Sequence, residues 1–341
     1  MKKDILIVGA GAIGGTIATI LTYKGYDPHV VVRYPEQKLK AKTEGFEITG
    51  YYGDHRVKLN AFLPSDLVYE KYDYILVATK AYDLERAAKV ISSHLKQDSL
   101  VVSLQNGICE DDLAKIVGKE RTVGCVIEWG ATLLNYGRFE MTSRGKFIIG
   151  MLDGKNDVRI KELKDILENI VPVRISNNIY GNLFSKLIID SCVTTLGGIS
   201  GENFGELVSD SRSRDIFINI IKESVEVANA MGIRITPFRG QGDFYWFLKG
   251  NHYLARKKRQ VLIQIFGYRF RNLVSSTFQS LERKKKTEID WLNGYISRRA
   301  GELELKVPVN DQLIKMIREI ESGTREISVT NLDDIILPDF R

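Results

Sequence analysis

Near its beginning, the chain passes from a short apolar run through a glycine-rich turn into a segment with helical spacing of apolar residues. The order is Asp4-Ile5-Leu6-Ile7-Val8 and then Gly9-Ala10-Gly11-Ala12-Ile13-Gly14. In a strand–turn–helix context, the first glycine permits a tight turn, the second lets backbone amides approach a pyrophosphate, and the third lets the helix pack on the strand. The helix N-terminus also favours the phosphate charge. We therefore predict a dinucleotide-binding loop formed by Gly9, Ala10, Gly11, Ala12, Ile13 and Gly14.

The residue that ends the second predicted strand, residues 28–33, bears on the choice of cofactor. An acidic residue there would bind the free ribose hydroxyl of NAD, whereas a cation would bind the additional phosphate of NADP. The chain has Arg33 at this position, which favours NADP (NADPH). Two alternatives stay open: Arg33 only ends an exposed strand, or Glu36 reaches a ribose hydroxyl.

Apolar runs and helical segments alternate through the first half of the chain. Strands are predicted at residues 72–79, 100–104 and 122–128, with a helix at about 83–94. This alternation predicts an α/β fold with a doubly wound parallel sheet of the Rossmann type. Short exposed strands are predicted at residues 46–63, with Gly50 and Gly53 at turns, and a hairpin at the sheet edge is predicted from residues 138–141 and 146–149.

The second half of the chain has the pattern of an all-helical domain. A helix at 158–170 and a short strand at 171–175 close the first domain, and apolar residues then recur at helical intervals through residues 182–196, 215–231, 273–300 and 311–320. We predict an NADP-binding domain at 1–175 and a helical domain at 176–341 for substrate binding and dimerisation. Residues 327–337 are expected to be strand-like or extended.

Composition excludes several classes of protein. With 341 residues and 44% hydrophobic composition, the chain exceeds the usual size of one core, which favours two domains. We find no apolar run long enough to cross a bilayer and no cleaved signal, so we expect a cytoplasmic protein without a membrane span. Three scattered cysteines and four histidines without ligand spacing predict no disulfide scaffold and no metal.

The net charge of +6 is concentrated in residues 256–286, where aromatic side chains alternate with Lys and Arg. Such a patch attracts anions, and an acidic membrane surface or a nucleic acid is one interpretation. No recognised nucleic-acid module accompanies the charge, and a solvated helix face gives the same pattern. We favour the solvated face and expect no nucleic-acid partner.

Two polar residues follow predicted strands directly. Lys80 comes after the strand that ends at Thr79, and Asn106 lies in Leu104-Gln105-Asn106-Gly107. Ligands of open α/β sheets bind outside the carboxyl ends of the strands, so Lys80 and Asn106 are candidates for both cofactor and substrate binding. Taken singly, a lysine after a strand is often solvated and an Asn-Gly pair is often only a turn.

A polar stripe interrupts the apolar helix at residues 182–194. Lys186, Asp190 and Thr194 follow one another at intervals of four residues and therefore lie on one helix face. A lysine held in such a helix can act as a proton donor, and the stripe would then face a substrate. The structural alternative is an ion pair between Lys186 and Asp190.

These pieces in this order resemble the ketopantoate reductase family, the NADPH-dependent 2-dehydropantoate 2-reductases of pantothenate biosynthesis. The resemblance covers most of the chain, and its most specific segment is Thr287-Glu288-Ile289-Asp290-Trp291-Leu292-Asn293-Gly294. It implies that Lys186 is the general acid and that Glu288, which alone would read as a surface charge, supports substrate binding and catalysis. It also implies that Lys80, Asn106 and Ser276 line the site between the two domains and that the protein is a homodimer.

The chain departs from the family pattern at two places. Asp190 and Thr194 stand where the family usually has asparagines, and an aspartate there repels an anionic keto acid unless a cation neutralises it. We therefore keep as an alternative a dehydrogenase of the same fold that acts on a different, cationic carbonyl substrate. Residues 237–274 are longer than the usual connection, and a reshaped pocket mouth or subunit contact is one interpretation. A second alternative function is a non-enzymatic NADP-responsive protein that binds an acidic partner through residues 256–271.

Overall fold

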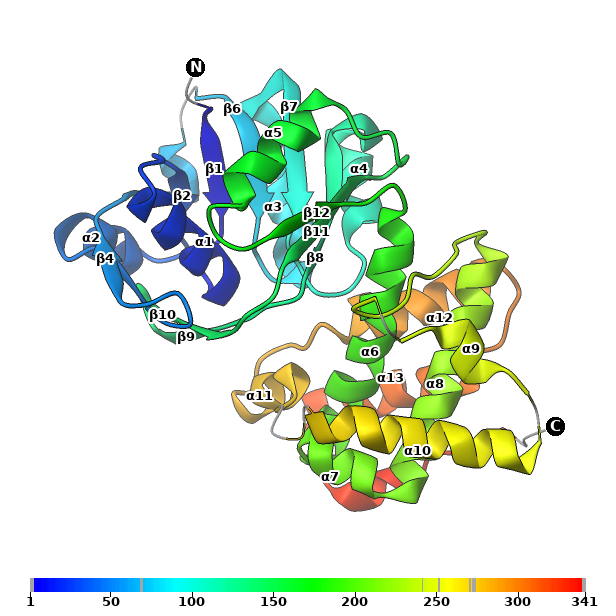
Figure 1. Cartoon of the computed structure of the whole chain (residues 1–341). Helices are drawn as coiled ribbons and strands as arrows, with labels where there is room; N and C mark the ends of the chain where they lie inside the picture. Colours follow the sequence, from blue (N-terminus) through cyan, green and yellow to red (C-terminus); the bar gives the residue numbers. More distant parts are fainter. Residues whose placement is uncertain are drawn as a thin grey trace. The chain divides into compact units, whose positions relative to one another are not determined.

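The computed structural model describes residues 3–67, 70–240, 242–250, 252–269, 271 and 274–338 (Figure 1). By its internal contacts the chain divides into two compact units, Met1–Gln105 with Cys109–Leu183, and Asn106–Ile108 with Phe184–Arg341. The division falls after Leu183 and not at residue 175, because the helix α6 (Ile179–Ser200) begins in the first unit and continues into the second.

The first unit is built on an eight-stranded sheet with the order β12-β11-β8-β7-β6-β1-β2-β5. From β8 to β5 in this order, every strand pairs in parallel with its neighbour. Strand β11 runs antiparallel to β8, and β12 is parallel to β11. The predicted Rossmann-type parallel arrangement is confirmed. The strands are β1 (Ile5–Val8), β2 (His29–Val31), β5 (Asn60–Phe62), β6 (Tyr72–Val77), β7 (Leu95–Ser103), β8 (Thr122–Ile127), β11 (Phe147–Met151) and β12 (Val173–Ile175).

Helices cover both faces of this sheet (Figure 1). Helices α3 and α4 contact each other on one face, whereas α1 and α5 lie on the other, where Asn169 after α5 donates to the Tyr26 hydroxyl after α1 at 3.2 Å. The helices are α1 (Ala12–Tyr23), α2 (Pro35–Thr43), α3 (Leu84–Ile91), α4 (Glu110–Val117) and α5 (Val158–Leu167), with 3₁₀ turns η1 (Pro64–Asp66), η2 (Ala81–Asp83), η3 (Ser92–His94) and η4 (Lys119–Arg121).

A second, four-stranded sheet has the order β4-β3-β10-β9 and packs on α1. The predicted hairpin is wrong, because β10 pairs with β9 and β3 of this sheet while β11 pairs with β8 of the other. The apolar side chain of Phe139 in β10 explains the pairing, since its ring lies directly over Gly15 of α1. The strands are β3 (Phe46–Gly50), β4 (His55–Val57), β9 (Gly130–Asn135) and β10 (Arg138–Ser143).

The second unit is helical, as predicted. The predicted helix at 273–300 is wrong, because α11 ends at Glu282 and Lys284 has a positive φ of 51° within an exposed run of four cations. Within the long connection at 237–274, residues 241, 251, 270, 272 and 273 lie outside the described residues. The helices are α6, α7 (Phe204–Ser209), α8 (Ser211–Ala230), α9 (Phe244–Leu248), α10 (Tyr253–Arg269), α11 (Ser276–Glu282), α12 (Asn293–Glu302) and α13 (Pro308–Glu321), with η5 (Ile289–Trp291) and η6 (Val329–Leu332).

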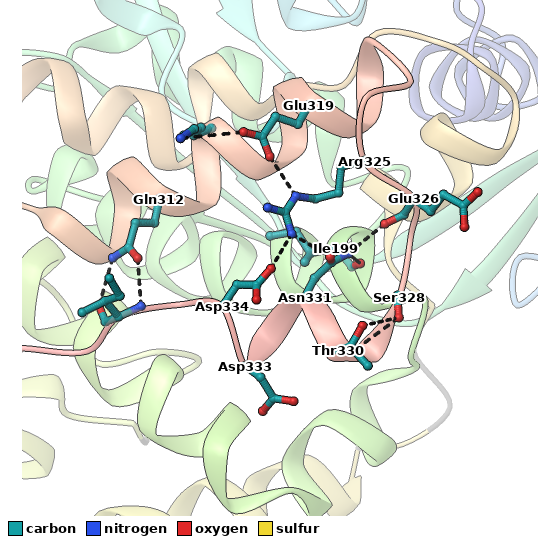
Figure 2. A network of polar contacts seen from close by, with 12 residues as sticks. Ile199, Gln312, Glu319, Arg325, Glu326, Ser328, Thr330, Asn331, Asp333 and Asp334 are labelled. Atoms are coloured by element: carbon teal, nitrogen blue, oxygen red, sulfur yellow. Dashed lines mark hydrogen bonds and ion pairs between the residues drawn. The ribbon is translucent and has the colours of Figure 1, made fainter.

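The chain after α13 is fastened by side chains and forms no strand in its described part, so the strand-like expectation for residues 327–337 is wrong. Figure 2 shows Arg325 at the centre of a polar network, with Glu319 at 2.8 Å, Asn331 at 2.7 Å and Asp334 at 2.8 Å. Asn331 in turn donates to the carbonyl oxygen of Ile199 at the end of α6. This segment therefore holds the end of α6 against α13.

Helix α6 corrects one further expectation. Among the described residues it is the one helix whose length and apolar composition would suit a membrane span, although no such run was expected. However, 78% of its most apolar window is buried inside the protein, as in a core helix. Burial in the fold therefore accounts for its composition.

Candidate active site

The loop between β1 and α1 has glycines at three positions that serve different purposes. Gly9 has a φ of 102°, and a side chain at Gly14 would lie 1.9 Å from the carbonyl oxygen of Gly9 and 2.8 Å from Cβ of Ala78. Gly14 is therefore required for packing of α1 on the strands. A Cβ at Gly11 would have no atom within 4 Å, so this position leaves room for a ligand to approach the backbone.

The beginning of α1 has the properties of an anion site. Gly11 precedes the helix without a side-chain cap, and the first turn contains no acidic residue. The first backbone N–H groups of a helix lack partners within it and carry partial positive charge. The loop therefore fits a pyrophosphate. Sequence reasoning missed the buried Gln37, whose amide donates to the carbonyl oxygen of Ala10 at 3.5 Å and braces the loop.

Arg33 lies two residues beyond β2, at the edge where the glycine loop begins. Its side chain is 60% exposed, and its guanidinium lies 3.5 Å from the carboxylate of Asp83 and 5.8 Å from the ring centre of Tyr34. An exposed ion pair of this kind contributes little to stability, so Arg33 can exchange partners at low cost. Glu36 is also exposed, in the first turn of α2.

Gln105, to which the sequence analysis assigned no role, links the ends of β6 and β7. The buried Gln105 accepts from the Ser103 hydroxyl at 2.7 Å and donates to the Thr79 hydroxyl at 3.4 Å. Lys80, exposed, comes directly after Thr79, and Asn106, also exposed, comes directly after Gln105. The signal for Gln105 was its position at the end of a strand, before the Asn-Gly pair.

The central feature of the second unit is the ammonium group of Lys186. It donates to the amide oxygen of Asn106 at 2.6 Å and to the carboxylate of Asp190 at 2.9 Å. The side chains of Lys186 and Asp190 are 22% and 21% exposed, so the pair is largely covered yet accessible. The structure thus brings Lys186 and Asp190 of the predicted polar stripe together with Asn106, which was predicted separately from its position after a strand.

The predicted polar stripe is the face of α6 that retains contact with solvent. Between Phe184 and Ser200, the partly exposed residues are Lys186, Ile189, Asp190 and Thr194, and the others are buried. Thr194 bonds the carbonyl oxygen of Asp190 through its hydroxyl at 2.8 Å, so its side chain is turned back along the helix.

The serine predicted to bind substrate has a neighbour with a clear structural role. Ser276 is the exposed first residue of α11. The buried Ser275 accepts from the backbone N–H of Phe278 and donates to the carbonyl oxygen of Thr194 at 2.5 Å. Ser275 therefore fixes the start of α11, and with it Ser276, to the helix that carries Lys186.

The most specific segment, residues 287–294, is a turn that braces the Asn106 loop and not part of a long helix. A side chain at Gly107 would lie 2.2 Å from the carbonyl oxygen of Trp291, so these backbones are in close contact. Glu288 is buried just before η5. Asn293, fully buried, accepts from the Thr195 hydroxyl of α6 at 2.6 Å and donates to Asn310 at 2.9 Å.

The Asn106 loop leads into α4 through a buried acid. Glu110 is 1% exposed and accepts a hydrogen bond from the backbone N–H of Cys109 at 3.0 Å. Burial raises the pKa of Glu110 to about 8. Sequence reasoning missed this group, since nothing in the local pattern marks a carboxyl group as buried.

The described residues offer few candidates for metal ligands or for reactive thiols. Within the described ranges, no group of three or more His, Cys, Asp or Glu side chains is placed to hold a metal ion. The absence of a metal stays a prediction. The three cysteines, Cys109, Cys125 and Cys192, are buried free thiols.

Comparisons with known proteins identify the family of the chain. The family model described as "Ketopantoate reductase PanE/ApbA" matches residues 5–154, and its C-terminal counterpart matches residues 178–321. Together the two models cover most of the chain. The chain belongs to the ketopantoate reductase family.

Relatives that align over nearly the whole chain belong to the same family. The chain is 26% identical to the 2-dehydropantoate 2-reductase of Archaeoglobus fulgidus over 94% of this chain and 99% of the relative. It is 27% identical to that of Pyrococcus horikoshii, over 93% and 97%. Like these relatives, the protein is an oxidoreductase acting on CH–OH groups. This assignment disagrees with the non-enzymatic alternative.

Solved structures share the fold. A PanE/ApbA family ketopantoate reductase from Ralstonia eutropha superposes with a TM-score of 0.80 at 27% identity, over 95% of this chain and all of that one. A D-mandelate dehydrogenase solved with NADH and anilino(oxo)acetate gives a TM-score of 0.81 at 23% identity, over 94% and 99%. The fold therefore serves reductases and dehydrogenases that differ in substrate.

Proposed function

We propose that this oxidoreductase uses NADPH to reduce ketopantoate, or a related 2-oxo acid, to the 2-hydroxy acid. The observation that carries the proposal is the ammonium group of Lys186, which is covered yet accessible. An ammonium group has three N–H donors, and two of those of Lys186 are occupied among the described residues, by Asn106 and Asp190. The third is available to a substrate carbonyl. The relatives named 2-dehydropantoate 2-reductase support the choice of substrate.

The chemistry assigns a role to each member of this cluster. A bound nicotinamide supplies the hydride. Lys186 donates a hydrogen bond to the carbonyl oxygen, stabilises the negative charge that develops there, and transfers its proton from Nζ. Asn106 and Asp190 accept from Nζ and hold it in one orientation.

Further members of the site are proposed from the family resemblance. Glu288 orients Lys186 or a substrate hydroxyl, Ser276 holds the substrate carboxylate, and Lys80 binds both substrate and cofactor. The buried position of Glu288 and the link from Ser275 to α6 support the first two roles.

Cofactor choice rests on the first unit. We propose that Gly9, Ala10, Gly11, Ala12, Ile13 and Gly14 hold the pyrophosphate and that Arg33 binds the 2′-phosphate of NADP. The uncapped start of α1 and the exposed guanidinium of Arg33 support both assignments.

Asp190 decides between two classes of substrate. Its carboxylate is 2.9 Å from the ammonium group of Lys186, so the pair is close to neutral and its repulsion of an anionic keto acid is reduced. A cationic carbonyl compound is the second candidate, because its ammonium group would pair with the same carboxylate. Thr194 lies one turn further along this face, and its hydroxyl, which donates to the carbonyl oxygen of Asp190, can accept a hydrogen bond from either substrate.

A substrate screen tests the proposal. The wild-type protein is mixed with NADPH and, in turn, with ketopantoate, other 2-oxo acids and amino-substituted carbonyls, and loss of NADPH is followed by absorbance. Oxidation that is fastest with ketopantoate or another 2-oxo acid supports the leading function. Fastest oxidation with a cationic carbonyl supports the second candidate. NADPH binding without oxidation by any of these compounds refutes both.

Cellular location and assembly are proposed on the same basis. We propose a cytoplasmic enzyme, because its three separate free thiols suit a reducing compartment. We propose a homodimer from the family resemblance. Sedimentation of the purified protein measures its mass in solution, and cell fractionation tests the compartment.

A further inference from the structure

One segment of the helical unit concentrates the positive charge of the chain. Residues 244–281 contain no Asp or Glu and seven basic residues, Lys249, Arg256, Lys257, Lys258, Arg259, Arg269 and Arg271. The whole chain has a net charge of only +6, so the remainder has no excess of cations. Arg256 pairs with Asp215 of α8 and Arg259 is buried, so attraction of an anionic surface rests on exposed cations such as Lys249, Lys257 and Arg271.

Helix α10, within this segment, presents an apolar face to solvent. Its inner face is buried in the helical unit through Ala255, Arg259, Gln260, Ile263 and Gly267. The opposite face has large exposed side chains at helical spacing, namely Tyr253 (67% exposed), Leu254 (70%), Val261 (52%), Ile265 (66%) and Tyr268 (70%). Soluble proteins rarely expose so many apolar side chains in one row without a partner.

Cations and aromatic rings flank this apolar face at both ends. Lys257 lies 5.5 Å from the ring centre of Tyr253, and Arg271 lies 4.8 Å from that of Tyr268. Lys258 lies 3.4 Å over the ring of Trp246, an exposed residue of the neighbouring α9. Aliphatic side chains in the middle with aromatic and cationic ones around them are typical of helices that lie in a membrane interface.

We propose that α10 docks the protein on an anionic lipid bilayer. The aliphatic row enters the boundary between headgroups and acyl chains, the rings of Tyr253, Tyr268 and Trp246 lie at headgroup level, and the lysines contact lipid phosphates. A planar anionic surface accounts for both properties of the face, its apolar row and the cations Lys257, Lys258 and Arg271 beside it.

Other partners satisfy only part of this pattern. A nucleic acid would use the cations but gains nothing from exposed Leu254, Val261 and Ile265. A second copy of the chain would bring the lysines of two α10 helices together, which like-charge repulsion opposes. The proposal is independent of the substrate, because none of these residues belongs to the proposed catalytic site.

Vesicle sedimentation with the full-length protein tests the proposal. Phosphatidylcholine vesicles with about one third phosphatidylglycerol are compared with pure phosphatidylcholine, at low and at high salt. We expect binding to the anionic vesicles that salt weakens, with little binding to the neutral ones. Replacing Lys257→Gln and Lys258→Gln should weaken binding about fivefold for each lysine, and Ile265→Ser should weaken it about tenfold.

Matched variants elsewhere control for loss of any exposed residue. Val158→Ser removes an apolar side chain that is 66% exposed on α5, and Lys42→Gln removes an exposed cation of α2. Both should bind vesicles like the wild type, and all variants should keep its melting temperature.

Three results would overturn the proposal. They are absence of binding to anionic vesicles, an equal loss of vesicle binding in the control variants, or dimers that form without vesicles and that Ile265→Ser dissociates. The last result would assign the face to a second copy, and binding of an acidic peptide without vesicle binding would assign it to a protein.

Discussion

The glycine loop of the first unit and the lysine cluster of the second are built in different ways. The loop depends on six consecutive residues, Gly9 to Gly14, whose backbone geometry forms the site. The cluster depends on the side chains of Asn106, Lys186 and Asp190, the first two of which are 80 positions apart. Substitutions in the loop should therefore act through packing and ligand approach, whereas substitutions in the cluster should act on chemistry.

Lys186→Ala should give the largest effect and sharpens this comparison. We expect turnover to fall about 10³- to 10⁴-fold, because the proposed proton donor and the charge it places on the carbonyl oxygen are lost together. The affinity for NADPH and the melting temperature should change little. Steady-state kinetics, a fluorescence titration with NADPH and a thermal melt measure the three quantities.

The matched variant Asp190→Asn keeps an oxygen that accepts from Lys186 and should retain most of the turnover with the best substrate of the screen. A melting temperature that falls equally in both variants, with turnover unchanged in Lys186→Ala, would assign the pair a structural role and contradict the proposed mechanism.

Glu110 is an exception to the contrast between a backbone-built first unit and a side-chain-built second unit. Its single side chain should govern how the stability of the first unit depends on pH. Burial raises the pKa of Glu110 from 4.5 to about 8. Between these values the unfolded chain has released a proton that the folded protein retains, so stability should fall as pH rises. The loss is about 5 kcal/mol for a shift of this size, complete above the folded pKa and absent below about pH 4.5.

Urea unfolding of the wild type and of Glu110→Gln, at about pH 5, 7 and 9, measures this dependence. The variant should lose most of the slope and, at the highest pH, be more stable than the wild type. Parallel pH profiles of the two proteins would show that Glu110 is not the group responsible.

Gly14→Ala and Gly11→Ala separate packing from ligand approach within the loop. A side chain at Gly14 would meet the backbone of Gly9 at 1.9 Å, so we expect a loss of about 3 kcal/mol in folding stability. A side chain at Gly11 meets nothing within 4 Å, so stability should be retained while NADPH affinity falls about tenfold. Denaturant unfolding and NADPH titration distinguish them, and retained NADPH affinity in Gly11→Ala would argue against a pyrophosphate at this position.

Arg33→Ala should reduce the preference for NADPH over NADH by about 30-fold, since one cation–phosphate contact is removed. Arg86→Ala is the matched control, because Arg86 is exposed and pairs with the same Asp83 at 2.9 Å. The ratio of kcat/KM for the two cofactors measures the preference. An unchanged ratio in Arg33→Ala, with weaker NADH binding in Glu36→Gln, would favour the alternative in which Glu36 contacts the ribose.

Much of the fold and part of the candidate site were predictable because their signals are local. The loop from Gly9 to Gly14 is recognisable from residues that are neighbours in sequence, and the parallel strands are recognisable from short apolar runs. Lys186, Asp190 and Thr194 share a face because helical spacing places them there, without information from the rest of the chain.

Only the tertiary structure decided which distant segments meet. It paired β10 with β9 and β3, broke the helix expected at 273–300, and placed Asn106 against Lys186 within the second unit. It also buried one face of α10 and left the other, with its large apolar side chains, exposed. Such outcomes depend on packing between residues far apart in sequence, and therefore leave no mark in any short stretch of the chain.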